Sequence, residues 1–199
     1  MRNKKKKIVI LGATGSIGLN AIDIIEKNPN LFKIVGLVAN SNFKKMEELS
    51  RKFLPEKIAF YNKNINKKIK LENFNKNVHI SFGEEGIISI AQMDADLVIN
   101  GIAGFAGLKP TMASIEVGRK IAIANKEPLV SAGNLIMENA KKNGAIILPV
   151  DSEHNAIFQI ISKFKTEEIS EVTLTASGGP FREDSLDLLS LRTPEEAVI

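Results

Sequence analysis

The amino-acid sequence predicts an α/β protein with a doubly wound parallel sheet, followed by the start of a second, α+β domain. Two observations predict the sheet. From residue 7 to about residue 160, short apolar runs of strand length alternate with segments of helical periodicity. Polar or glycine-rich segments follow several of these runs, where parallel strands would end. A change of character after residue 150 predicts two domains, residues 1–150 and 151–199.

Seven strands are expected in the sheet, and most segments between them have the periodicity of helices. A helix is predicted over Leu108–Val117, where Pro110 falls in the first turn and Gly118 follows the end. Residues 62–77 lack a clear pattern and are interpreted as a surface excursion. The strands are expected at residues 7–11, 33–38, 57–61, 78–82, 96–100, 119–124 and 144–149.

The first helix has the clearest pattern, and Asn28-Pro29 is expected to end it. Three further elements are expected after Asp151: a helix that includes Ile157, a strand at 171–176 and a polar helix at 186–199. The residues expected to share one face of the first helix are Ile17, Ala21, Ile24 and Ile25.

Composition excludes several classes of protein. The sequence contains no cysteine, which excludes a disulfide framework and a thiol nucleophile. Its apolar runs are far shorter than the roughly 20 residues of a membrane-spanning helix. The basic segment Met1–Lys7 runs directly into a strand and leaves no room for a signal peptide, so a cytoplasmic protein is expected. The net charge of +4 comes largely from lysines with few aromatic neighbours, which predicts a solvated surface and no nucleic-acid partner. The short apolar runs predict no membrane partner either.

A glycine-rich turn, Gly12-Ala13-Thr14-Gly15-Ser16-Ile17-Gly18, follows the first strand and opens the first helix. Glycines let the backbone approach a pyrophosphate, and the free N–H groups of a helix start favour its charge. The turn predicts a Rossmann-like dinucleotide site; the alternative is a tight turn that binds no ligand. After the second strand, Ala39-Asn40-Ser41-Asn42 lacks the acidic residue that would bind the ribose 2′-hydroxyl of NAD. A cation for the 2′-phosphate of NADP is also missing there, with Lys44 and Lys45 the nearest.

The segment Asp151-Ser152-Glu153 stands directly at the carboxyl end of the seventh predicted strand. Because side chains at positions i and i+2 of an extended backbone share a face, Asp151 and Glu153 are expected to converge, with Ser152 pointing elsewhere. Two carboxylates in this position suit Mg²⁺ or Mn²⁺, completed by water and substrate oxygens. The alternative is a pair of solvated loop acids. His154 is interpreted either as a base or ligand, or as a residue that holds the start of the next helix.

Two more polar segments follow predicted strands. Asn125-Lys126-Glu127 is expected to open into the same crevice, although a Lys–Glu pair is often a surface ion pair. Ser177-Gly178-Gly179-Pro180 would either present backbone N–H groups and the Ser177 hydroxyl to a phosphate, or form a simple turn. Because these loops occur together at strand ends, they favour a ligand site over unrelated surface features.

Four segments, in their order and spacing, resemble the 1-deoxy-D-xylulose 5-phosphate reductoisomerase family. The resemblance implies that residues 1–150 bind NADPH and that residues 151–199 begin a catalytic domain. The implied reaction forms 2-C-methyl-D-erythritol 4-phosphate, an isoprenoid precursor of the non-mevalonate pathway: Mg²⁺ or Mn²⁺ holds the hydroxyketone oxygens, the carbon skeleton rearranges, and NADPH reduces the aldehyde. The segments are Gly-Ala-Thr-Gly-Ser-Ile-Gly at 12–18, Ala-Asn-Lys-Glu at 124–127, Leu-Pro-Val-Asp-Ser-Glu-His-Asn at 148–155 and Ala-Ser-Gly-Gly-Pro-Phe at 176–181.

The resemblance also implies roles for single residues and a homodimer. Lys126, Asp151 and Glu153 would be catalytic, and the two carboxylates would also bind the metal. The sugar-phosphate substrate would contact Lys126, Ser152, Glu153 and Ser177. The residues that would contact the cofactor are Thr14, Gly15, Ser16, Ile17, Asn42, Asn125 and Glu127.

The sequence departs from the family pattern in two ways. The family usually shows Gly-Lys-Asn where this sequence has Asn40-Ser41-Asn42, which predicts a weaker contact to the 2′-phosphate. The family's lid, third metal carboxylate and phosphate site would all follow residue 199, so we expect the 199 residues alone to be inactive.

Two other functions fit part of the pattern. An aspartate-semialdehyde dehydrogenase-like enzyme has a similar glycine turn, but it uses a cysteine nucleophile, which this sequence lacks. A non-catalytic, dinucleotide-binding regulatory domain would retain the fold without chemistry. Binding a dinucleotide does not require Lys126, Asp151, Glu153 and Ser177, whose joint occurrence favours an enzyme.

Overall fold

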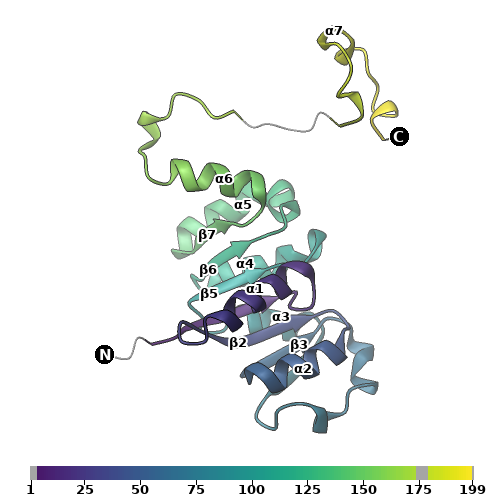
Figure 1. Cartoon of the computed structure of the whole chain (residues 1–199), viewed down its shortest axis with the longest axis vertical. Helices are drawn as coiled ribbons and strands as arrows, with labels where there is room; N and C mark the ends of the chain where they lie inside the picture. The colour runs from purple at the N-terminus through teal and green to yellow at the C-terminus, as the bar shows by residue number, and fades with distance from the viewer. Residues whose placement is uncertain (1–3, 174–178, 199) are drawn as a thin grey trace. The chain divides into compact units, whose positions relative to one another are not determined.

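The structure of the chain, a computed structural model, describes residues 4–173 and 179–198 (Figure 1). It divides into two compact units, Met1–Asn155 and Ala156–Ile199. The first unit contains a seven-stranded parallel sheet in the order β4-β3-β2-β1-β5-β6-β7, which confirms the predicted α/β class. All seven strands lie within two residues of their predicted bounds: β1 Lys6–Leu11, β2 Phe32–Ala39, β3 Lys57–Phe60, β4 His79–Phe82, β5 Leu97–Asn100, β6 Lys120–Ile123 and β7 Ile146–Pro149.

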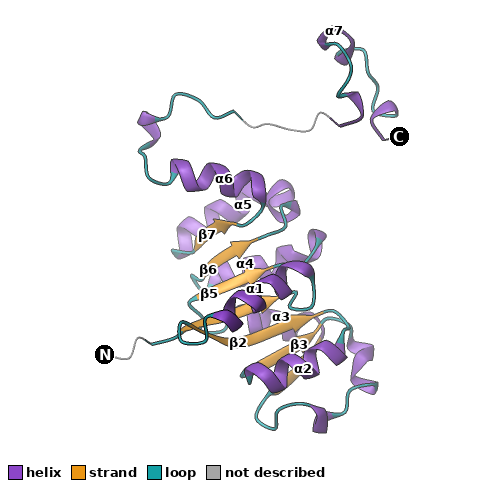
Figure 2. Ribbon diagram, in the orientation of Figure 1, coloured by secondary structure: helices purple, strands orange, loops and turns teal. Residues whose placement is uncertain are grey.

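Helices cover both faces of the sheet, so the strands can be apolar on both sides (Figure 2). Alternate residues of β1 enter two separate cores. Val9 and Leu11 pack in a core shared with α3, α4 and α5, whereas Ile8 and Ile10 pack in a core shared with α1 and α2. The helices are α1 Ser16–Lys27, α2 Phe43–Phe53, α3 Gly83–Ala91, α4 Leu108–Glu116, α5 Glu127–Asn143 and α6 Ser152–Ile161.

The strand order reverses between β1 and β5, which are neighbours in the sheet although far apart in the sequence. Strands β2, β3 and β4 extend from one side of β1, and β5, β6 and β7 extend from the other. Since every strand is parallel, the loops that follow all seven lie along one edge of the sheet. This edge is where an open α/β sheet binds its ligands.

The helices at 16–27 and 108–116 confirm two predictions, but the buried face of α1 differs from the predicted one. Gly18, Ile22 and Ile25 are buried, whereas Ile24 is 57% exposed. The prediction was wrong about Ile24 because the missing side chain of Gly18 lets α1 pack against the backbone of Gly12 and Ala13, on the face that includes positions 18, 22 and 25. Residues 62–77 contain two 3₁₀ turns, Lys63–Lys67 and Leu71–Asn73.

The second unit contains the end of α6, three 3₁₀ turns and the short helix α7, Leu186–Leu189. The predicted strand at 171–176 is wrong for residues 171–173, which are not extended in a sheet, and residues 174–176 lie outside the described part. The predicted helix at 186–199 is also wrong. Pro194 has no N–H to donate and disfavours helical backbone at Thr193, so one continuous helix cannot run from 186 to 199; α7 ends at Leu189, and a separate 3₁₀ turn forms at Glu196–Val198.

No helix in the described part of the chain has the length and apolar character needed to cross a bilayer.

Candidate active site

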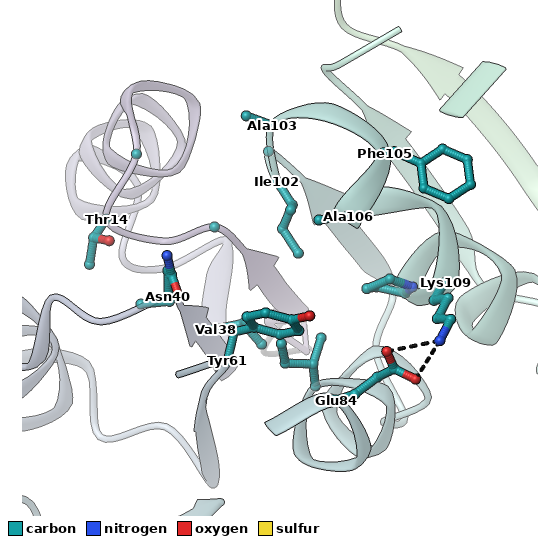
Figure 3. Close-up of a pocket in the computed structure, with 16 residues that line it drawn as sticks. Thr14, Val38, Asn40, Tyr61, Glu84, Ile102, Ala103, Phe105, Ala106 and Lys109 are labelled. Carbon is teal, nitrogen blue, oxygen red and sulfur yellow. Dashed lines mark hydrogen bonds and ion pairs between the residues drawn. The ribbon is translucent and has the colours of Figure 1, made fainter. Parts of the chain in front are cut away.

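A cavity of about 650 Å³ opens at the carboxyl ends of the central strands, between the turn after β1 and the loop after β5 (Figure 3). It occupies the position where the strand order reverses. The ends of β2 and β3 and the starts of α3 and α4 complete its walls. Apolar side chains such as Ile87 and Ile102 line most of it, and Thr14, Asn40 and Tyr61 add polar groups.

The glycine turn forms one wall through close backbone contacts. Gly12 has a φ of +84°, a conformation that favours glycine, and a Cβ there would lie 2.8 Å from the carbonyl oxygen of Gly101. The Val38 carbonyl accepts hydrogen bonds from the N–H groups of Gly12 at 3.0 Å and Ala13 at 2.7 Å. Gly15 is the N-cap of α1, and in the described structure no side chain caps this helix. The first N–H groups of α1 are therefore available to an anion.

Four of the predicted cofactor residues lie in this turn. Thr14 and Gly15 line the cavity. Ser16 is exposed at the first position of α1. The side chain of Ile17 packs against Gly101 in the loop after β5. The contact is so close that a Cβ on Gly101 would lie 3.1 Å from the Ile17 Cβ. The turn and the loop after β5 are thus held against each other by contacts that only small residues permit.

Asn42, the predicted ribose contact, is engaged in holding a helix. Its Oδ1 accepts a hydrogen bond from the N–H of Lys45 at 3.2 Å, which caps the start of α2. Asn40, two residues earlier, lines the cavity instead. The Lys45 ammonium is paired with Glu48 at 2.7 Å, whereas Lys44 is an exposed residue in the first turn of α2.

The loop after β5 was missed by the sequence analysis, although it forms the wall opposite the glycine turn. Asn100 is 2% exposed and holds this loop. Its Nδ2 donates to the Gly107 carbonyl at 3.0 Å and to Thr111 Oγ1 at 2.8 Å, and its Oδ1 accepts from the Ile102 N–H at 3.1 Å. Three glycines at 101, 104 and 107, directly after a predicted strand, were the signal that could have revealed it.

An ion pair at the far end of the cavity was also missed. The Lys109 ammonium donates to both carboxylate oxygens of Glu84, at 2.8 and 2.9 Å, and joins the first turns of α3 and α4. The hydrogen bond to Glu84 raises the pKa of Lys109, and the charge of Glu84 adds to this effect. The two residues are 25 positions apart, so no local sequence pattern connects them.

A second group of polar side chains lies where β6 and β7 end. Asn125 and Lys126 follow β6, and Glu127 begins α5. The Lys126 Nζ lies 3.7 Å from Glu153 Oε2, so the loops after the two strands are electrostatically joined. Both side chains are about half exposed. The structure therefore brings Lys126 and Glu153 together, as the idea of one crevice requires.

The predicted extended arrangement of Asp151, Ser152 and Glu153 is wrong, because α6 begins at Ser152. Asp151 Oδ1 accepts a hydrogen bond from the His154 N–H at 3.1 Å, and Oδ2 lies 2.8 Å from His154 Nδ1. Asp151 thus holds the helix start together with His154, the second of the two interpretations of this histidine. The Ser152 hydroxyl does not point away from the pair but donates to Glu153 Oε2 at 3.0 Å.

Both carboxylates are ionised at neutral pH. Burial raises the pKa of Asp151, but the hydrogen bonds from the backbone and ring of His154, together with the charge of Lys126, lower it further than burial raises it. The pKa of Glu153 is lowered by its own backbone N–H, the Ser152 hydroxyl and Lys126. The charge of Asp151 opposes this shift, which indicates that the two carboxylates repel each other.

The donor set fits part of a divalent-metal site. Two neighbouring carboxylates are hard ligands of the kind that Mg²⁺ prefers, and a cation between them would relieve their repulsion. Within residues 4–173 and 179–198, however, no group of three or more His, Asp or Glu side chains gathers that could hold a metal alone. Ser177, the remaining predicted substrate residue, lies outside the described residues.

Comparison with known proteins gives a consistent result. Residues 8–133 match the family described as 1-deoxy-D-xylulose 5-phosphate reductoisomerase, and residues 147–199 match the C-terminal domain described for the same enzyme. The 1-deoxy-D-xylulose 5-phosphate reductoisomerase of Francisella tularensis subsp. novicida is 46% identical over 198 residues, which cover 98% of this chain and 51% of the relative. The chain spans about half the length of the curated relatives it matches.

Two solved structures are similar over nearly the whole chain. The reductoisomerase of Zymomonas mobilis in complex with NADPH is 38% identical, with a TM-score of 0.83, and the match covers 98% of this chain and 52% of that one. A DOX-P reductoisomerase in complex with NADPH, fosmidomycin and magnesium is 38% identical, with a TM-score of 0.77, over 98% of this chain and 50% of that one. From its glycine turn to its paired carboxylates, the chain belongs to the 1-deoxy-D-xylulose 5-phosphate reductoisomerase family.

Proposed function

We propose that this chain forms part of an NADPH- and divalent-metal-dependent reductoisomerase that converts 1-deoxy-D-xylulose 5-phosphate to 2-C-methyl-D-erythritol 4-phosphate in isoprenoid precursor biosynthesis. The observation that carries the proposal is the order of groups along one sheet edge. The cavity lies at β1 and β5, Lys126 follows β6, and Asp151 and Glu153 follow β7. Relatives solved with NADPH, and with fosmidomycin and magnesium, support it.

This order suits a dinucleotide lying across the strands. Its phosphates would meet the N–H groups at the start of α1, and its adenosine half would lie toward β2 and β3, where the cavity continues. Its nicotinamide would then point toward β6 and β7. Neighbouring strands are about 4.8 Å apart, so the three steps from β1 to β7 amount to about 14 Å. A hydride donor would thus come close to the carboxylates.

The proposed roles follow from these positions. Residues 1–150 would form the NADPH-binding domain, and residues 151–199 would begin the catalytic domain. Lys126, Ser152, Glu153 and Ser177 would bind and orient the sugar phosphate, with the ammonium of Lys126 matching its negative charge. The cofactor contacts would be Thr14, Gly15, Ser16, Ile17, Asn42, Asn125 and Glu127.

Asp151 and Glu153 would hold Mg²⁺ or Mn²⁺ together with substrate and water oxygens. The ion would supply Lewis-acid polarisation of the substrate oxygens, and NADPH would supply the hydride. His154 keeps the Asp151 carboxylate in a fixed orientation through two contacts. Lys126 would balance the charge of Glu153 when no cation is bound.

The setting of the enzyme is part of the proposal. A cytoplasmic location with neither membrane nor nucleic-acid partners is proposed, and the scattered lysines with few aromatic neighbours support the absence of a nucleic-acid site. The resemblance to the family supports a homodimer.

Cofactor binding is tested by adding one methyl group to the glycine turn. Gly15 has an ordinary φ of −84°, and a Cβ there would meet only the Gly12 carbonyl oxygen, at 3.4 Å, so Gly15→Ala should fold. The methyl group should hinder the approach of the phosphates and weaken NADPH binding at least about tenfold, or 1.4 kcal/mol. Gly133→Ala is the control, since a Cβ there meets nothing within 4 Å. Unchanged affinity of Gly15→Ala in a fluorescence titration would contradict the cofactor assignment.

Turnover separates an enzyme from a regulatory domain that binds the same cofactor. In the full-length protein, NADPH oxidation that depends on 1-deoxy-D-xylulose 5-phosphate should disappear in Glu153→Gln. A wild-type protein that binds NADPH but never oxidises it with this substrate would favour the non-catalytic alternative.

A further inference from the structure

The cavity ends at three side chains from different elements: Tyr61 after β3, Glu84 in α3 and Lys109 in α4. Figure 3 shows the Tyr61 ring across the cavity from Ile102, with its hydroxyl directed to the side where Glu84 and Lys109 meet. The Tyr61 N–H donates to the Ala39 carbonyl at 3.0 Å, which fixes the start of this loop beside β2. One end of the cavity thus carries an aromatic ring beside two opposite charges.

The ion pair is poorly placed to serve stability. Its side chains are 46% exposed for Glu84 and 66% exposed for Lys109, and exposed pairs contribute little to folding. The two helices it joins are already tied by a buried contact, in which the Ser114 hydroxyl donates to the Ala91 carbonyl at 2.9 Å. The pair does, however, border the cavity. The pair is therefore placed to contact a ligand in the cavity.

The pair retains free hydrogen-bonding capacity on the cavity side. An ammonium has three donors, and Lys109 uses two of them on Glu84. Each carboxylate oxygen of Glu84 can accept a further hydrogen bond. One donor thus lies beside acceptors, and the edge of adenine is complementary: its N6 amino group donates, and its adjacent ring nitrogens accept.

We propose that Glu84 and Lys109 read the edge of the adenine base of the cofactor, with Glu84 accepting from the N6 amino group and Lys109 donating to a ring nitrogen, while Tyr61 supports the face of the ring. This inference rests on the proposed binding of NADPH in the cavity. It makes the pair a determinant of base specificity, separate from the turn that holds the phosphates.

The test compares two cofactors that differ only at this edge. Deamino-NADPH carries hypoxanthine, in which a carbonyl oxygen replaces the N6 amino group and would face the Glu84 carboxylate. The 199-residue chain should bind NADPH about tenfold more tightly than deamino-NADPH in calorimetric titrations, a difference of about 1.4 kcal/mol. Glu84→Gln can both accept and donate, so the ratio should fall toward one. Glu85→Gln, on the next exposed position of α3, is the control and should keep the wild-type ratio.

A charge swap distinguishes base reading from a structural ion pair. The double variant Glu84→Lys with Lys109→Glu keeps opposite charges between α3 and α4 but exchanges the donor and the acceptors. If the pair reads the base, the double variant should show no preference for adenine, as in Glu84→Gln. If the pair only joins the helices, the double variant should show the wild-type preference.

Three outcomes would overturn the inference while leaving the proposed function in place: a wild-type ratio near one, a tenfold ratio retained in Glu84→Gln, or its recovery in the swap. Absence of any NADPH binding by the wild-type chain would overturn the proposed function as well.

Discussion

The side chain of Asn100 should be the main support of the cavity wall after β5. Asn100→Leu keeps a side chain of similar size but removes three hydrogen bonds, two donated and one accepted. At about 1 kcal/mol each, their loss costs about 3 kcal/mol. Burying the leucine returns about 1 kcal/mol in this polar setting, so the free energy of unfolding should fall by about 2 kcal/mol.

Of the groups that Asn100 contacts, the Ile102 N–H should be affected most by the substitution. The Gly107 carbonyl keeps a hydrogen bond from Thr111 Oγ1 at 2.8 Å, whereas the Ile102 N–H loses its Asn100 partner. Amide exchange at Ile102 should therefore accelerate more than exchange at the centre of β1. Urea unfolding followed by circular dichroism measures the stability change. Asn139→Leu is the control, because the half-buried Asn139 side chain donates to the Leu135 carbonyl of its own helix at 2.8 Å and holds no loop. If Asn100→Leu lies within about 0.5 kcal/mol of wild type, the assigned role is refuted.

Three further results are expected. The chain should prefer NADPH to NADH by a small margin, because no acidic residue stands at positions 39–42, and Ser41→Lys should widen the margin; equal affinities in fluorescence titrations would oppose this. Mn²⁺ should bind weakly and lose affinity in Asp151→Asn, since two carboxylates make an incomplete site; calorimetry that shows no change would show that Asp151 is not a ligand. The 199 residues alone should not oxidise NADPH with 1-deoxy-D-xylulose 5-phosphate, because catalysis needs a complete ligand set and exclusion of water; oxidation that Glu153→Gln abolishes would disprove this expectation.

The fold was largely predictable because burial on both faces makes each strand a short apolar run. The run at 7–11, which forms β1, is one example. The end of α1 was predictable for a different reason, because Asn28-Pro29 stops a helix. The errors have local causes. Periodicity alone put Ile24 on the buried face, although Gly18 decides how α1 packs. In the second unit, residues 186–199 were interpreted as one polar helix, but Pro194 is incompatible with the interior of such a helix.

The site was predictable only where its residues are close in sequence. The glycine turn and the segment around Asp151 could be found because each is a contiguous motif, but the geometry of Asp151 depends on α6, which begins at Ser152 within a segment that was expected to be extended. The Glu84–Lys109 pair joins two helices across 25 residues, so its existence depends on how α3 and α4 pack. In the sequence, Asn100 is only the last residue of a strand, and its hydrogen bonds to the following loop are visible only in the structure.

The position of Tyr61 gives the protein a natural optical probe. The sequence contains one tyrosine and no tryptophan, so nearly all of its near-ultraviolet emission arises from this ring. The ring borders the cavity and is 53% exposed. Any ligand that covers it changes its solvent contact, and a ligand with an overlapping absorption band quenches it. Occupancy of the cavity can therefore be followed in the unlabelled wild-type chain, with Tyr61→Phe as the dark reference.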